Sequence, residues 1–392
     1  MDHDLCAFRR SLHAAPELSD REVRTARSVV DVLRALAPNR LWTGLGGHGV
    51  AAEFVGPAPG PAVLVRCELD ALPIVEKTGV AHRSTVDGVA HLCGHDGHMA
   101  IVVGLARRLA ARPPARGRAI VLFQPAEETG AGARRVVADP RFAEFAPDHA
   151  FALHNLPGYP RGAVVVRDGT FSCASRGLVV TLRGATSHAA HPEDGRSPAA
   201  AMCRLVEVLG ELPRDPVLSD LGFVLATVVH ARLGEVAFGT APGEAVVMAT
   251  LRATTDAAIE QVAAHAEHAA RGIAAGQNLE VGIEWRDVFD ATVNDAAAVE
   301  RVRAAAAALG LERVELDAPF RWSEDFGALA KTATSAMFGL GAGTAHPQLH
   351  AEDYDFPDDL LDPGVAMFEH LVRDVTVGPA PSVPPRDSWS RP

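Results

Sequence analysis

The sequence predicts an α/β protein in which a mostly parallel sheet forms a larger domain and a smaller α/β domain is inserted into it. The first half of the chain alternates between strand and helix patterns, which is typical of a parallel sheet with helices on both faces. From about Gly177 the order changes to β-α-β-β-α-β, which is a complete unit in itself. The chain then returns to a helix and a late cluster of histidine and acidic residues. With 392 residues, two or three domains are expected.

The elements of the larger domain follow from hydrophobic spacing. Residues 21–36 have the apolar spacing of a helix, and the serine and acidic residues before them suit a helix start. Residues 97–112 are apolar over several turns and end in arginines, which indicates a buried helix. Strands are predicted within three apolar runs bounded by turn residues, at 61–73, 118–130 and 149–158.

The inserted unit has the element order of a split βαβ, or ferredoxin-like, arrangement. Its strands are predicted at 177–184, 223–232, 245–253 and 279–287, with helices at 197–212 and 256–276. The expected boundaries are 1–174 and 289–377 for the two segments of the larger domain, 175–288 for the insert, and 378–392 for a proline-rich tail that is expected to be disordered.

Composition excludes several classes of partner. The net charge of −12 argues against a surface for nucleic acid or for anionic membranes. No apolar run approaches the length of a membrane span, and the N-terminal residues lack the pattern of a signal peptide. The five cysteines are scattered and odd in number, which favours a reducing compartment. We therefore expect a cytoplasmic protein with a small-molecule partner.

Polar residues able to bind metals follow each of the three predicted strands. Glu68 and Asp70 follow the first strand, Glu127 and Glu128 follow the second, and His154 follows the third. Loops are polar in any protein, so polar residues after a single strand would not indicate a binding site. Three together favour a site, because ligands of open α/β sheets bind beyond the carboxyl ends of the strands.

The stretch "HLCGHDGHMA", residues 91–100, adds a soft ligand to this set. The candidate ligands are Cys93, His95, Glu127, Glu128, His154 and His350. Thiolate, imidazole and carboxylate groups together suit one or two transition ions such as Zn²⁺ or Mn²⁺. They do not suit Mg²⁺ or Ca²⁺, which prefer oxygen ligands alone.

The adjacent acids Glu127 and Glu128 indicate a division of roles. Neighbouring side chains on an extended segment point in opposite directions. One carboxylate can therefore bind metal while the other faces the attacking water as a general base.

Eight segments, in order and over nearly the whole chain, resemble the M20 metallopeptidases and most closely their amidohydrolase branch. That branch includes hippurate hydrolases, N-acyl-amino-acid amidohydrolases and plant auxin-conjugate hydrolases. The segments are "RRSLHAAPELSDRE", "VRCELDALPI", "HLCGHDGHMA", "FQPAEETGAGA", "ALHNLP", "SHAAHPEDGRSP", "SEDFG" and "LHAEDYDFPD". The resemblance implies a catalytic α/β domain and an inserted lid that commonly dimerises.

The resemblance also implies a role for each matching residue. Two divalent ions (Zn, Mn or Co) would be held by Cys93, His95, Glu128, His154 and His350, with Cys93 as a bridging thiolate. Glu127 would be the general base, and Asp70 would orient a ligand. His188, in the lid, would stabilise the developing oxyanion, often across a dimer interface.

Three positions bear on substrate choice or geometry. Glu68 stands where the branch usually has aspartate, which would alter the support of the ligands slightly. Gly239 replaces an asparagine that helps to bind substrate near its carboxylate. Arg252 would clamp a substrate carboxylate or form an interface salt bridge. Unless another group substitutes for the asparagine, the substrate is expected to lack a free carboxylate there or to carry a bulkier group.

Other histidines and acids have more than one interpretation. His98 lies one turn after His95 and is expected on a helix face or in support of a ligand. Glu324 and Asp325 would either hold His350 in place or cap the following helix.

Together these observations predict a binuclear, metal-dependent amidohydrolase that cleaves the amide of an N-acyl amino acid or a related amine by metal-activated water. It is expected to form a homodimer through the lid. The alternatives are a dipeptidase or aminoacylase and, in a different class, a non-catalytic M20-like ligand-binding protein. A base beside a ligand, as in Glu127 and Glu128, argues against pure binding.

Overall fold

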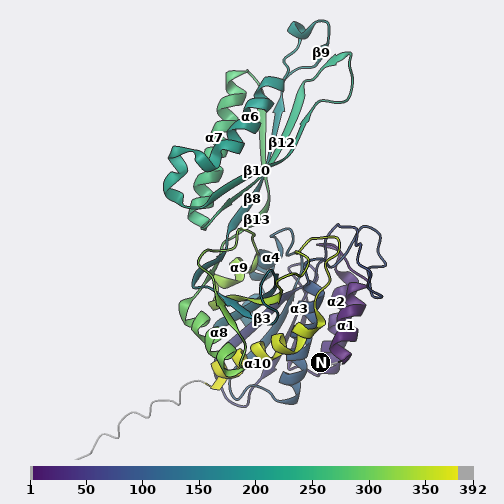
Figure 1. Cartoon of the computed structure of the whole chain (residues 1–392), viewed down its shortest axis with the longest axis vertical. Helices are drawn as coiled ribbons and strands as arrows, with labels where there is room; N and C mark the ends of the chain where they lie inside the picture. The colour runs from purple at the N-terminus through teal and green to yellow at the C-terminus, as the bar shows by residue number, and fades with distance from the viewer. Residues whose placement is uncertain (1–2, 378–392) are drawn as a thin grey trace, which may run out of the picture.

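The computed structural model describes residues 3–377 as two joined units (Figure 1). The larger unit contains the N-terminus, and the smaller, elongated unit projects from it. The chain enters the smaller unit at β8 and leaves it at β13. The tail expected to be disordered, 378–392, lies outside the described residues.

The larger unit is built on an eight-stranded mixed sheet of order β1-β2-β4-β3-β5-β16-β6-β15. Its four central strands β4, β3, β5 and β16 run parallel, while β1 and β2 form an antiparallel edge. The strands are β1 Arg40–Leu45, β2 Gly49–Val55, β3 Ala62–Glu68, β4 Arg118–Gln124, β5 His149–Pro157, β6 Val164–Val166, β15 Arg313–Glu315 and β16 Thr334–Gly343. The three predicted strands are thus β3, β4 and β5, and the prediction of a mostly parallel sheet is confirmed.

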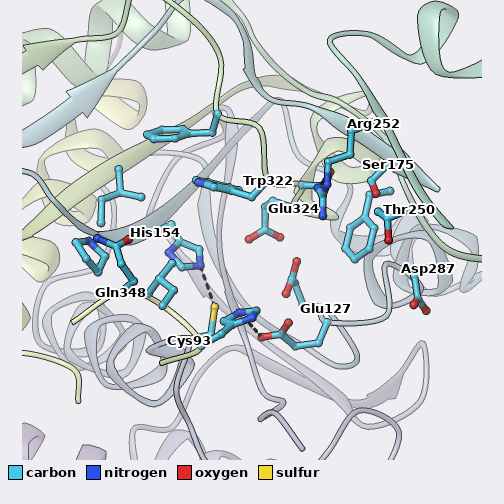
Figure 2. Close-up of a pocket in the computed structure, with 18 of the residues that line it drawn as sticks. Cys93, Glu127, His154, Ser175, Thr250, Arg252, Asp287, Trp322, Glu324 and Gln348 are labelled. Atoms are coloured by element: carbon cyan, nitrogen blue, oxygen red, sulfur yellow. Dashed lines mark hydrogen bonds and ion pairs between the residues drawn. The ribbon is translucent and has the colours of Figure 1, made fainter. Parts of the chain in front are cut away.

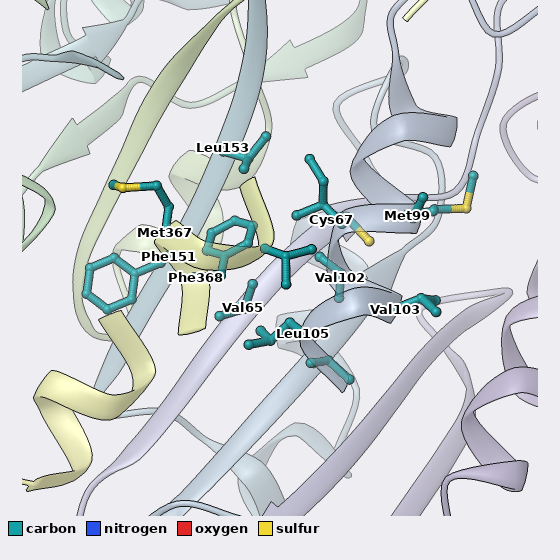
Figure 3. Close-up of a cluster of buried hydrophobic side chains, with 14 of the residues drawn as sticks. Val65, Cys67, Met99, Val102, Val103, Leu105, Phe151, Leu153, Met367 and Phe368 are labelled. Atoms are coloured by element: carbon teal, nitrogen blue, oxygen red, sulfur yellow. The ribbon is translucent and has the colours of Figure 1, made fainter. Parts of the chain in front are cut away.

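Helices cover both faces of this sheet. One face packs against α1 His3–His13, α2 Val23–Ala35, α3 His95–Ala111, α8 Ala296–Ala308 and α10 Leu361–Val377; the other packs against α4 Gly132–Ala138, α5 Phe142–Phe145 and α9 Phe326–Ala330. A hydrophobic core lies on each face of the sheet. Alternate residues of β3 pack into the two cores, because successive side chains of a strand point to opposite faces. Val63 and Val65 pack on the α3 side, and Leu64 packs on the α4 side. Figure 3 shows the first core, where β3 and β5 meet α3 and α10.

The start of α2 is capped by an acidic residue, one of the two kinds of residue that the sequence offered before this helix. The carboxylate of Glu17 accepts hydrogen bonds from the backbone N–H groups of Arg24 and Thr25, at 2.7 and 2.9 Å. Ser19 instead donates a 2.6 Å hydrogen bond to Asp70. The serine therefore supports the strand-end region rather than the helix.

The smaller unit is a four-stranded antiparallel sheet of order β10-β12-β8-β13. Its elements are β8 Ala174–Arg183, α6 Ala199–Glu211, β10 Val224–Leu233, β12 Glu244–Ala253, α7 Asp256–Gly276 and β13 Glu280–Phe289. Both helices pack on one face and share an apolar core with the sheet. The start of β8 and the ends of β12 and β13 lie where the two units meet.

Short elements complete the fold. Two-stranded ladders join β9 Ser187–His188 to β11 Thr240–Ala241 and β7 Gly169–Ser172 to β14 Thr292–Asn294. Short 3₁₀ turns lie at Pro192–Asp194, Leu212–Arg214, Pro216–Leu221 and Asp358–Leu360.

Candidate metal centre and substrate cleft

The carboxyl ends of β3, β4 and β5 meet at one edge of the sheet and carry the predicted site residues. Asp70 follows β3, Glu127 and Glu128 follow β4, and His154 lies near the end of β5. These strands are neighbours and parallel, so their ends converge as the sequence predicted.

A glycine brings Cys93 and His95 against these strand ends. Gly94, between them, has a φ of 90°, and a Cβ at this position would lie 2.1 Å from Oδ1 of Asn155 in β5. Only glycine combines this backbone conformation with so close an approach. The turn places the thiol before α3 and the imidazole in its first turn.

The predicted ligands lie close together, and Figure 2 shows two of them, Cys93 and His154, pointing toward each other near Glu127. Cys93 Sγ lies 3.5 Å from Nε2 of His154. His95 Nε2 lies 3.8 Å from a carboxylate oxygen of Glu127 and 3.8 Å from one of Glu128. Such separations leave room between the atoms for ions bound at about 2.0–2.3 Å.

His350 reaches the same place from a distant part of the chain. Its Nε2 lies 3.9 Å from Oε1 of Glu128, and its backbone N–H donates a 2.8 Å hydrogen bond to Leu92, next to Cys93. Its φ of 65° lies in the left-handed region, which is unfavourable for a histidine and is held by this packing. Cys93 belongs to two groups of three residues whose ligand atoms lie within 4.8 Å of one another. One group is Cys93, His95 and His154, and the other is Cys93, Glu128 and His350.

Two buried atoms at the centre lack hydrogen-bond partners among the described residues. They are Nε2 of His95 and Oε1 of Glu128. Buried polar atoms nearly always have a partner, so an unmatched imidazole nitrogen facing an unmatched carboxylate oxygen is the arrangement expected around a cation. The donor set and its orphaned atoms fit a divalent metal.

Asp70 aligns several of these groups at once. Its two carboxylate oxygens accept hydrogen bonds from the backbone N–H groups of Glu127 and Glu128, at 3.1 and 3.0 Å. Its backbone carbonyl accepts a 2.8 Å hydrogen bond from Nδ1 of His95. Because Nδ1 donates outward, Nε2 of His95 faces the centre.

The electrostatics of the centre are set by several acid groups buried together. Burial, followed by the nearby carboxylate of Glu324, raises the pKa of Glu127 well above its usual range. Burial raises the pKa of Glu128 to about 7, although His95 opposes the shift. Burial opposes the charged form of His95, but the surrounding carboxylates outweigh it and raise its pKa to about 9. Burial and the two glutamates raise the pKa of Cys93 well above that of a free thiol. A bound cation would relieve this excess of acid groups.

A buried arginine beneath the site was missed by sequence analysis. Arg66 in β3 forms ion pairs with Glu68, Glu324 and Asp325 and donates a 2.8 Å hydrogen bond to Gln124. The signal in the sequence was an arginine within an otherwise apolar strand, which indicates a buried ion pair.

The prediction that Glu324 and Asp325 hold His350 is not supported, because both acids form ion pairs with Arg66. Glu324 also accepts a hydrogen bond from the N–H of Phe326 at the start of α9.

His98 supports the site from α3, as the sequence favoured. Its Nδ1 donates to Glu68 at 2.7 Å, and its Nε2 accepts from the backbone N–H of Asn155 at 3.2 Å. Both ring nitrogens are occupied, which leaves none for a metal. The longer side chain of Glu68 reaches His98 and Arg66 together.

A cavity of about 650 Å³ opens over the ligand atoms, between the two units. One wall, from β8, β12 and β13, carries Ser175, Thr250, Arg252 and Asp287, as Figure 2 shows. The opposite wall is apolar and aromatic and includes Leu156, Pro157, Tyr159, Phe320 and Trp322. The rings of Phe320 and Trp322 stack with centroids 4.7 Å apart, and Trp322 lies 5.6 Å from the His154 ring. Sequence analysis did not identify this aromatic wall.

His188 and Gly239 do not reach this cavity within one chain. His188 lies in β9 and is exposed, at the end of the smaller unit far from the large sheet (Figure 1). Gly239 lies beside it, where its carbonyl accepts from Ala189 and an added Cβ would meet nothing within 4 Å. Their proposed roles stay predictions. Arg252, by contrast, lies in the cleft.

The strand-end position, the converging ligand atoms and the adjacent glutamate define a candidate two-metal hydrolase site. The family model of "Peptidase family M20/M25/M40" matches residues 64–374. The chain belongs to this family.

Similar proteins cover nearly the whole chain. It is 27% identical over 367 residues to an N-acetyldiaminopimelate deacetylase of Exiguobacterium sibiricum, covering 94% of this chain and 98% of that one. It is 32% identical over 331 residues to an N-acetyl-L-cysteine deacetylase of Bacillus subtilis, covering 83% and 77%. The crystal structure of a dinuclear metal binding peptidase of the M20 family from Bacillus subtilis matches with a TM-score of 0.79 and 27% identity, over 96% of this chain and 98% of that one.

Proposed function

We propose that the protein is a metal-dependent amidohydrolase that cleaves the amide bond of an N-acyl amino acid. The observation that carries the proposal is the pair of orphaned, buried atoms on His95 and Glu128, which face each other within a ring of ligand side chains beside Glu127. The names of the two deacetylases support the substrate class. Family membership supports amide-bond hydrolysis.

Two divalent ions, Zn²⁺, Mn²⁺ or Co²⁺, would be held by the five predicted ligands. Cys93 belongs to both groups of three and would bridge the ions; the other ligands are His95, Glu128, His154 and His350. When bound, such ions supply Lewis-acid chemistry that polarises a carbonyl and acidifies water. The solved relative with two metals supports the count.

Glu127 would act as the general base. It lines the cleft beside the ligand atoms, where a carboxylate is placed to accept a proton from bound water. It would take a proton from the attacking water and deliver it to the leaving nitrogen. The backbone N–H of Asp325 donates to its Oε1 at 3.4 Å and helps to fix the carboxylate.

The two walls of the cleft would orient the substrate. Arg252 donates to Ser323 and to the carbonyl of Arg321, at 2.9 and 3.2 Å, and has no carboxylate partner among residues 3–377. It would bind the substrate carboxylate and take over the role lost with Gly239. The aromatic wall around Trp322 would receive the acyl group.

We further propose that residues 175–288 are an inserted ferredoxin-like lid and dimerisation domain, with 1–174 and 289–377 forming the catalytic domain. The strand order β13-β8-β12-β10 and the two helices on one face support this arrangement. In a homodimer, His188 of one subunit would stabilise the oxyanion in the cleft of the other. Its distance from the cleft of its own chain supports action across the interface.

We propose a cytoplasmic location. All five cysteines lie within residues 3–377 and are free, which suits a reducing compartment. No helix among the described residues is long and apolar enough to cross a membrane.

Hydrolysis of N-acetyl and N-benzoyl amino acids by the metal-reconstituted protein tests the proposal. Release of the free amino acid, abolished by a chelator and restored by one of the three metals, is expected. A fully metal-loaded protein that hydrolyses no N-acyl amino acid would refute the activity.

A further inference from the structure

His350 is more exposed than the other predicted ligands and depends on contacts made by its own loop. Its side chain is 49% exposed, against 15% for Glu128, and the other three ligands are buried. It lies in residues 344–357, an irregular segment between β16 and the 3₁₀ turn at Asp358, here called the His350 loop. A ligand on such a segment binds metal well only where neighbouring groups hold its side chain in place.

A buried arginine of α1 holds this loop. The side chain of Arg9 is 0% exposed and forms ion pairs with Asp355 in the loop and, at 3.5 Å, with Asp358 just after it. The Cζ atom of Arg9 also lies 5.9 Å from the centre of the Phe356 ring. The guanidinium therefore contacts the end of the His350 loop through two carboxylates and an aromatic ring.

The same guanidinium contacts the start of α3. Nε of Arg9 lies 2.7 Å from Oδ2 of Asp96, a buried residue in the first turn of that helix. Phe356 packs on this turn as well, because a Cβ on Gly97 would lie 2.3 Å from its ring. Arg9 thus links the first turn of α3 to the His350 loop.

The shape of the arginine side chain suits this link. A planar guanidinium donates in several directions at once, whereas lysine carries one compact charge on a flexible stem. Nε of Arg9 faces Asp96, and Nη2 faces Asp355. Nη1 lies 2.9 Å from Nε2 of His82. Buried ion pairs contribute little net stability, because desolvation offsets the attraction, so the network is better explained by the geometry that it fixes.

A second anchor of the loop does not involve Arg9. The hydroxyl of Tyr354 accepts a 2.7 Å hydrogen bond from the side-chain amide of Asn155 in β5, and both residues are buried. This anchor remains when Arg9 is changed. Loss of Arg9 is therefore expected to loosen the His350 loop without detaching it.

We propose that Arg9 is a positioning residue that sets the affinity of one of the two metal positions. The first position is the group of Cys93, His95 and His154, and the second position is the group of Cys93, Glu128 and His350. Weaker support of the His350 loop weakens the second position alone, because His95 keeps its separate hydrogen bond to the carbonyl of Asp70. This inference rests on the metal centre of the proposed function and not on any substrate.

Titration of the metal-free protein with Zn²⁺ against a competing chelator tests this role. The wild type should bind two ions per chain. Arg9→Lys keeps the buried positive charge but not the fork of donors, so it should keep the affinity of one ion and bind the other about 10- to 100-fold more weakly. Asp355→Asn breaks the same link from the loop side. Its side chain is 24% exposed, so this variant should fold and show the same selective loss.

Two controls separate this effect from charge and from stability. Arg10→Lys changes the next arginine, whose side chain is 52% exposed and pairs with Asp358. Val302→Ala removes buried atoms from the core around α8. Both should bind two ions with wild-type affinities, even though Val302→Ala melts lower. Loss of one ion in Val302→Ala, or unchanged affinities in both Arg9→Lys and Asp355→Asn, overturns the proposal. Equal weakening of both ions, or a single ion in the wild type, overturns it as well.

The titration requires no turnover, so its result stands whether or not the protein hydrolyses N-acyl amino acids. In the active protein, excess metal should restore kcat of Arg9→Lys to near the wild-type value, because no ligand or base has been removed. Glu127→Gln should stay inactive at the same metal concentration. An Arg9→Lys protein that holds two ions and stays inactive would refute a role exerted through the metal.

Discussion

Nε2 of His95 lies 3.8 Å from Oε1 of Glu128, and neither atom has a hydrogen-bond partner among the described residues. Asp70 fixes both groups from outside, through its carbonyl and its carboxylate. The hydrogen bond to Nδ1 directs Nε2 of His95 inward, and the hydrogen bond to the backbone of Glu128 holds its chain segment beside it. A cation shared by the two orphaned atoms would satisfy both.

Removal of that cation should make stability depend on pH in a specific direction. In the metal-free protein the pKa of His95 is raised from 6.5 to about 9, so between these values the folded state binds more protons than the unfolded state. Stability from His95 is fully present below about pH 6.5 and is lost as the pH rises through 9. We expect the melting temperature of the chelated protein to fall between pH 7 and 9. Saturating Zn²⁺ should remove the fall, and a chelated protein that melts higher at pH 9 would contradict the assignment.

Arg252→Ala should remove the preference for a free carboxylate. The arginine is the cation of the polar wall, and loss of a charged hydrogen bond costs about 1.5–3 kcal/mol, or roughly ten- to hundredfold in binding. KM for an N-acyl amino acid should rise by that factor, while KM for the matching carboxamide changes little. Gly239→Asn is the comparison variant, since it restores the asparagine that the family resemblance implies at this position. A wild type that handles acid and carboxamide equally well would refute this role.

Arg66→Met should destabilise the protein by about 3–5 kcal/mol, because it leaves the buried carboxylates of Glu68, Glu324 and Asp325 without their cation. Urea denaturation measures the loss. Arg183→Ala is the control, since it breaks an exposed pair with Glu244 and should cost under about 1 kcal/mol. Equal losses for the two variants would show that the buried network contributes no more than a surface pair.

Much of the site was predictable because its residues follow strand ends. Parallel neighbours β3, β4 and β5 bring Asp70, Glu127 and His154 together by topology alone. Cys93 and His350 were found through motifs, and their convergence required the fold.

Other features depend on tertiary contacts that leave no regular sequence pattern. The bulge that turns Asp287 toward the cleft depends on the pairing of β13 with β8. The aromatic wall around Trp322 forms from separate loops and strands that pack together only in the folded chain. His188 would reach a cleft only through the proposed dimer, and one chain does not show how two subunits would associate.

Mixed subunits test whether His188 acts across a dimer interface. His188→Ala and Glu127→Gln proteins should each be inactive alone. After subunit exchange, some heterodimers would combine an intact His188 with an intact Glu127 in one cleft, and partial activity should return. Proven exchange without recovery would mean that the histidine acts within its own chain or not at all.

The metal content per chain, measured by elemental analysis, tests the central claim most directly. Cys93→Ser and His350→Ala should fold but bind less metal than the wild type, because each removes one ligand atom from the cluster. Glu127→Gln should keep its metal while kcat falls by about 10²–10⁴, since it removes a proton acceptor and not a ligand. Full metal loading in Cys93→Ser and His350→Ala, or loss of metal in Glu127→Gln, would contradict the assignment of the site.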